Sequence, residues 1–154
     1  MYKRNRCFSY VLTSLVVFTG SVSSEGLNET VRSLARCSGV LPYSVNLHLM
    51  SNNSGAAKSM LLQSSKVVVA LFARSFENDS LPGWKILEFD RLTDNLPQYF
   101  AKHPERLAGE IDVCNVLANK VLSEEIRKGT KIEGKNIFEL VNYIHEGQAK
   151  LLGI

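Results

Sequence analysis

Histidine and cysteine, the side chains best suited to hold a metal or act as a nucleophile, are scarce in this sequence. The three histidines are His48, His103 and His145. No two of them have the i,i+4 spacing that places two ligands on one face of a helix. A zinc site needs three or four converging ligands. The sequence therefore predicts no metal and no cofactor.

One short segment has the spacing of a phosphate-binding loop. Residues 129–136, GTKIEGKN, match Gly-x4-Gly-Lys, but Asn136 stands where such a loop needs a Ser or Thr for magnesium. The segment also follows a predicted helix, whereas a phosphate loop follows a strand. No Gly-x-Ser-x-Gly elbow for a nucleophilic serine occurs. We therefore expect 129–136 to link two helices, and we expect a protein that is not an enzyme.

The N-terminus is typical of a secretory signal peptide. The basic MYKRNR precedes the apolar CFSYVLTSLVVFT and the small residues GSVSS. Val22 and Ser24 occupy the −3 and −1 positions of a cut after Ser24. The apolar run is about 13 residues, too short for a span of about 20. We expect removal of 1–24 and export of 25–154 to the periplasm or the medium, with no membrane span remaining.

Cleavage would change the charge of the chain. Three of the 18 basic residues, Lys3, Arg4 and Arg6, lie in the signal, so 15 basic residues would face 15 acidic ones. Nucleic-acid binding calls for Lys and Arg clustered on one face of a basic domain. A mature chain with no net charge gives no support to a nucleic-acid partner.

Cleavage would also remove Cys7 and leave Cys37 and Cys114. An even number of cysteines in an exported protein predicts an oxidised pair. The alternative is two buried free thiols. We expect a disulfide between Cys37 and Cys114.

Helical periodicity marks the first strong segment, 27–50. Apolar residues recur there at three- and four-residue intervals: Leu27, Val31, Leu34, Cys37, Leu41 and Val45. Asn28 can cap this helix, and Pro42 should kink or divide it near Gly39. Alternation over 44–50 also suits a short strand, so that alternative stays open.

Three further segments predict the rest of the fold. A helix over 56–76 is apolar on all sides at VVVALFA, so it should be central. The irregular 77–103 contains Pro97, which should break any long helix, and a short helix over 90–96.

A helix from Pro104 carries an apolar face made of Leu107, Ile111, Cys114, Ala118, Val121 and Leu122. A last helix, capped by Asn136, should turn inward Ile137, Leu140, Val141, Ile144 and Leu151.

Cys37 and Cys114 each lie on the apolar stripe of their helix. Packing these stripes together brings the two sulfurs to the core side of both helices. The sequence thus predicts an all-α, single-domain bundle of four to five helices over 25–154, mostly up-and-down, tied by one long-range disulfide.

The candidate functional residues are aromatic. Trp84, Tyr99 and Phe100 lie in or beside the irregular connection, where binding residues tend to sit on a rigid scaffold. The alternative is that these aromatic residues cap the core of the bundle. Trp and Tyr are common interface anchors. We expect a protein that binds another protein, of the inhibitor or toxin-neutralising immunity type. An envelope accessory or structural subunit that oligomerises is the second hypothesis, and an enzyme with an unrecognised site is the third.

Overall fold

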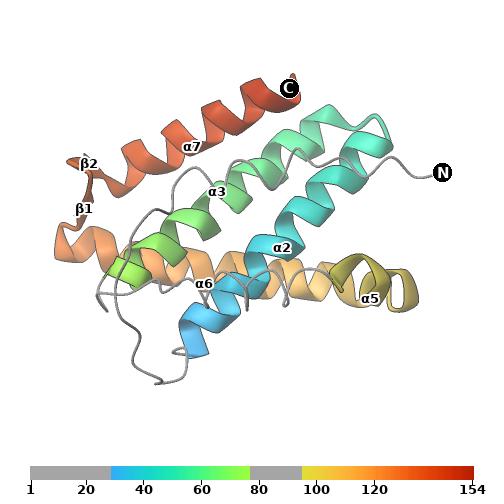
Figure 1. Cartoon of the computed structure of the whole chain (residues 1–154), viewed down its shortest axis with the longest axis horizontal. Helices are drawn as coiled ribbons and strands as arrows, with labels where there is room; N and C mark the ends of the chain where they lie inside the picture. Colours follow the sequence, from blue (N-terminus) through green and yellow to red (C-terminus); the bar gives the residue numbers. More distant parts are fainter. Residues whose placement is uncertain (1–28, 77–94) are drawn as a thin grey trace, which may run out of the picture.

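The computed structural model describes residues 29–76 and 95–154. These residues form five helices and one small hairpin, so the predicted all-α bundle is confirmed. The signal segment 1–24, Asn28, Trp84 and the short helix expected over 90–96 fall wholly or largely outside the described residues. Figure 1 shows the arrangement of the elements along the chain.

The first helix, α2, runs unbroken over Glu29–Met50 with Pro42 inside it. The expected division near Gly39 is therefore wrong, and 44–50 is helix rather than strand. An interior proline removes one backbone hydrogen bond and costs about 3 kcal/mol. Leu41 and Val45 on either side of Pro42 are fully buried, and their packing holds the helix through that position.

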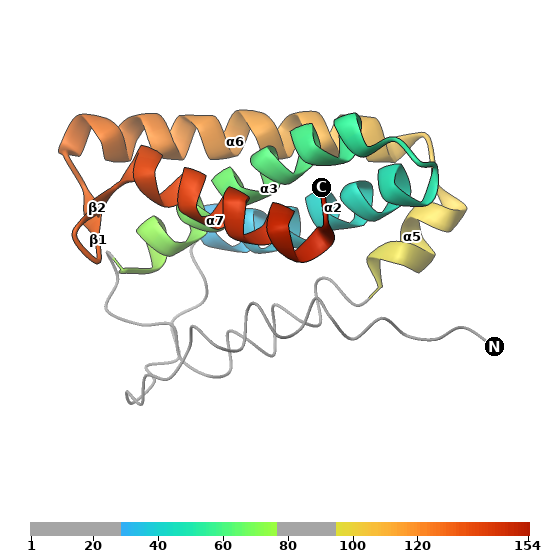
Figure 2. The same ribbon diagram turned by 90° about the horizontal axis from the view of Figure 1, so that it is seen from above.

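The second helix, α3, spans Ser54–Phe76 and lies at the centre of the bundle, as its apolar block predicted. It runs beside α2, and it also packs against α6, Arg106–Lys128, and α7, Ile137–Leu152. Figure 2 shows α6 along one side of the molecule and α7 along the other, with α3 between them.

By length and composition, the α3 helix also resembles a membrane-spanning helix. Among the described residues it is the one helix, over Ser54–Ser75, that is long and apolar enough to cross a membrane, with 44% of that window buried in the protein. A core helix of a soluble protein passes the same test, so the observation is weak evidence for a span.

The short helix α5 spans Leu96–Lys102 with Pro97 at its start, which agrees with the prediction that this proline interrupts any long helix. Pro97 lies in the first turn of α5, where the missing N–H has no intrahelical acceptor to lose. Leu96 and Phe100 of α5 enter the main core beside α2 and α6.

The connection between α6 and α7 is a tight hairpin. Strands β1, Lys131–Ile132, and β2, Lys135–Asn136, pair antiparallel around Glu133 and Gly134, which both have positive φ. Asn136 then caps α7 in a reciprocal capping box with Glu139, as expected from the sequence. The segment therefore links two helices, and its backbone forms no phosphate cradle.

The core is built mainly from the predicted stripes, to which α5 adds Leu96 and Phe100. Its largest cluster joins side chains from every described helix: Leu34, Cys37, Val40, Leu41, Val67, Val69, Ala70, Leu96, Phe100, Cys114, Ala118, Val121, Leu122, Ile137, Leu140 and Val141. Leu151, expected to point inward, is 72% exposed. The inward positions at the end of α7 are instead Ala149, which is buried, and Leu152, which packs against it.

Candidate protein-binding surface

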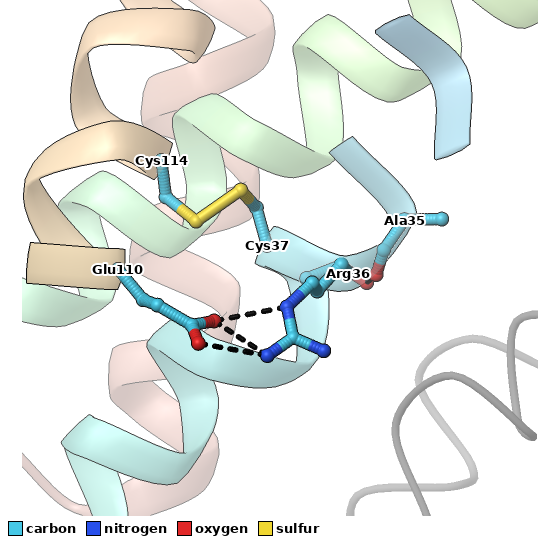
Figure 3. The surroundings of a disulfide bond; sticks show 6 residues. Ala35, Arg36, Cys37, Glu110 and Cys114 are labelled. Atoms are coloured by element: carbon cyan, nitrogen blue, oxygen red, sulfur yellow. Dashed lines mark hydrogen bonds and ion pairs between the residues drawn. A yellow bond between two sulfur atoms is a disulfide. The ribbon is translucent and has the colours of Figure 1, made fainter. Parts of the chain in front are cut away.

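The disulfide between Cys37 and Cys114 fixes α6 against α2. The two sulfurs are 2.11 Å apart, and the bond closes a separation of 77 residues. Both cysteines are buried, on the faces that their helical stripes predicted. An ion pair lies one turn away, where Arg36 Nε and Nη2 donate to the two carboxylate oxygens of Glu110 at 2.9 and 2.8 Å. Figure 3 shows the covalent and ionic links side by side.

The predicted aromatic residues separate into different environments. Phe100 is 2% exposed and stacks on Tyr43 of α2, with ring centroids 5.5 Å apart. It belongs to the core, so its assignment to a binding surface is wrong. The sequence could not show this, because the inward face of a seven-residue helix is set by the helices it packs against. Trp84 lies outside the described residues.

Tyr99 is half-buried and lies between two arginines. The guanidinium of Arg36 lies over its ring at 5.5 Å from the centroid, and Arg106 Nη1 donates to its hydroxyl at 3.0 Å. This hydrogen bond raises the pKa of Arg106 above its ordinary value. These two contacts hold the Tyr99 side chain against the bundle. Tyr99 therefore does not project from the surface as an interface anchor would.

A buried carboxylate fixes the other end of α6. Glu125 is 0% exposed, and its oxygens lie 3.2 Å from Arg74 Nη1 of α3, 3.0 Å from Lys128 Nζ and 2.7 Å from the Thr130 hydroxyl. No substrate could reach a carboxylate so enclosed. Its contacts join α3, α6 and the start of the hairpin, which is a structural role.

The outward face of α6 carries the most exposed apolar side chains of that helix. Val113 is 64% exposed and Val116 is 69% exposed. Gly109, one turn before Val113, has nothing within 4 Å of the position of a Cβ atom. We call the exposed residues Glu105, Gly109, Asp112, Val113, Val116, Lys120, Ser123 and Arg127 the α6 outer face.

The α6 outer face lies on the opposite side of the helix from Cys114 and Glu110, which link α6 to α2. Val113 and Val116 flank Cys114 in sequence, yet they project away from the bundle while Cys114 enters the core. This face was not predicted from the sequence, because the inward stripe of α6 is the stronger periodic signal. The available signal was two β-branched apolar residues that fall outside that stripe.

The part of the chain that the structure describes contains no cluster of metal-ligating side chains. Within residues 29–76 and 95–154, no three His, Cys, Asp or Glu side chains lie close enough together to hold a metal ion. His48, His103 and His145 lie on α2, at the end of α5 and on α7, respectively.

Comparisons with known proteins identify no relative: no family model matches the chain, and searches of curated proteins and of solved structures found no match.

Proposed function

We propose that this chain is an exported, non-enzymatic protein that works by binding protein through the α6 outer face. The observation that carries the proposal is the position of Val113 and Val116, exposed on the helix that the disulfide and the Arg36–Glu110 pair hold in place. A rigid presenting element lowers the ordering cost of binding.

The composition of the α6 outer face supports binding to protein. Its apolar centre at Val113 and Val116 is bordered by charged and small polar side chains, among them Asp112, Lys120 and Ser123. Protein interfaces commonly combine an apolar centre with a polar rim. Both signs of charge occur on this face, which does not suit a polyanion such as nucleic acid.

Export rests on the N-terminal signal and is supported by the cysteine pair. Disulfides persist in oxidising compartments and are rare in the reducing cytosol. The Cys37–Cys114 bond is consistent with such a location. Mass analysis of the protein recovered outside the cytoplasm tests this part: a chain beginning at Glu25 is expected, and a chain that keeps 1–24 contradicts it.

Site-specific photo-cross-linking tests the binding surface. A photoreactive amino acid replaces Val116 in the cell that makes the protein, and a matched control replaces Lys150, which is exposed on α7. We expect a covalent protein adduct from position 116 that is absent from position 150. A chain that forms no adduct from either Val113 or Val116 contradicts the proposed function, whatever position 150 does.

The second candidate function is an oligomerising envelope subunit. It is favoured by one specific observation, the distribution of charge along the α6 outer face, which is acidic before Val116 and basic after it.

A further inference from the structure

We propose that the protein bound by the α6 outer face is a second copy of this chain, paired antiparallel about a two-fold axis at Val116. This inference rests on the proposed function, because it names the partner of the same surface. The order of charges along one exposed helix face supports this pairing.

Acidic residues occupy the first half of the α6 outer face and basic residues the second half. Glu105 and Asp112 precede Val116, and Lys120 and Arg127 follow it. All four side chains are exposed. Their spacing of seven, eight and seven residues, about two helical turns each, keeps them on one side of a helix.

The charges are placed symmetrically about Val116. Asp112 lies four residues before Val116 and Lys120 four residues after it, while Glu105 and Arg127 lie eleven residues before and after. An isologous two-fold contact brings residue i of one copy to residue j of the other, and j to i. An antiparallel pair centred on Val116 therefore sets Asp112 against Lys120 twice and Glu105 against Arg127 twice.

The uncharged positions fit the same register. Val116 meets Val116 of the second copy, and Gly109 lies opposite Ser123, so small residues face each other on both sides of the centre. Val113 lies beside the aliphatic stem of Lys120 in the second copy. A parallel pair would instead set Asp112 against Asp112 and Lys120 against Lys120, so the charge pattern selects the antiparallel arrangement.

The contacts that these charges make within one chain leave them able to pair across an interface. Glu105 lies 3.7 Å from His103 Nδ1 and 4.0 Å from Arg106 Nε, at the outer limit of an ion pair. Arg127 Nε donates to the Ser123 carbonyl of its own helix at 3.4 Å. All of these contacts lie at the exposed surface and would exchange readily for opposite charges on a second copy.

The size of the contact sets its strength. From Glu105 to Arg127 the helix is about 33 Å long. A single pair of helices of this length gives an interface at the small end of the range for specific complexes. We therefore expect a reversible dimer with a dissociation constant on the order of 10 µM, weakened by salt.

Sedimentation equilibrium of the oxidised mature chain, residues 25–154, tests the dimer. Val116→Asp sets two carboxylates together at the axis and should weaken dimerisation by at least about tenfold. Asp112→Lys and Lys120→Asp should each weaken it by about tenfold, and the double variant, which restores opposite charges, should recover most of the affinity. Glu146→Lys, a charge reversal at an exposed position of α7, is the matched control and should leave the affinity unchanged. Circular dichroism checks that each variant is folded.

The outcomes separate this inference from the proposed function. A chain that is monomeric at several hundred micromolar, or a dimer unaffected by Val116→Asp, overturns the antiparallel pairing. If the photoreactive residue at 116 then captures a different protein, the proposed function stands without the inference. If position 116 captures neither a second copy nor another protein, both are refuted.

Discussion

Removing the disulfide should lower the stability of the fold without changing its architecture. The change is the double substitution Cys37→Ala and Cys114→Ala, which deletes the one bond that links α2 to α6 covalently. Both sulfurs lie in the main core, so the substitutions also leave a small space there. The Arg36–Glu110 pair, one turn away, remains to orient the two helices.

The magnitude follows from the length of chain that the bond closes. The separation is 77 residues. In the chain-entropy model, a loop of that length contributes about 4.5 kcal/mol at 25 °C by restricting the unfolded chain. Globular proteins gain about 2.1 cal/mol/K of entropy per residue on unfolding, so for about 130 residues the melting temperature should fall by roughly 15 °C.

Urea and thermal unfolding followed by circular dichroism measure this difference. Reductant provides the matched control: it should destabilise the natural chain by a similar amount and leave the double variant unchanged. A loss below about 1 kcal/mol would refute the entropic argument, because it would mean that the unfolded chain already holds these two segments together.

Three further substitutions test how the elements are held. Glu125→Gln removes the charge that faces Arg74 and should cost about 2 kcal/mol in urea unfolding, whereas an equal loss from Glu146→Gln, at an exposed position of α7, would contradict a special role for burial. Asn136→Ala removes the cap of α7 and should cost about 1 kcal/mol of folding stability. The loss should be seen as faster amide hydrogen exchange in the first turn of α7, and unchanged exchange would contradict a stabilising role for the cap. Glu133→Asn should stabilise the hairpin by about 0.5 kcal/mol, because Glu133 has φ 50° and Asn tolerates that conformation better; a lower melting temperature would contradict this.

The long helices could be predicted because their evidence is local. The inward stripe of α6, from Leu107 to Leu122, recurs at helical intervals and needs no knowledge of its neighbours. The disulfide followed from the number of cysteines left after the expected cleavage and from their places on two such stripes. Each of these inferences uses information carried by a few turns of one segment.

The incorrect predictions concern residues whose environment is set by other elements. Phe100 was expected at a surface, and it is buried because Tyr43 of α2 stacks on it. Leu151 was expected in the core, but its side chain is 72% exposed, and Ala149 and Leu152 take the inward positions at the end of α7.

The buried charge could not be predicted for a related reason. Glu124 and Glu125 stand together in a polar part of α6, and both resemble solvent-exposed positions of a helix. Glu125 follows Glu124 by one position, yet its side chain is fully buried. There Arg74, which is distant in sequence, supplies the opposite charge. A carboxylate group is costly to bury alone, and although Lys128 and Thr130 lie near in sequence, the contact with Arg74 comes only with the tertiary fold.

The fold itself gives no reason for valine at positions 113 and 116. Both side chains are largely exposed in the middle of α6, where they fill no core space. Valine is also a weaker helix former than alanine, lysine or glutamate, since its branched side chain loses rotamer freedom in a helix. Each valine therefore costs the isolated helix a few tenths of a kcal/mol and exposes apolar surface to water. Under the proposed function, the benefit that offsets this cost comes from a contact outside the monomer, and the charges arranged about Val116 mark the surface that would supply it.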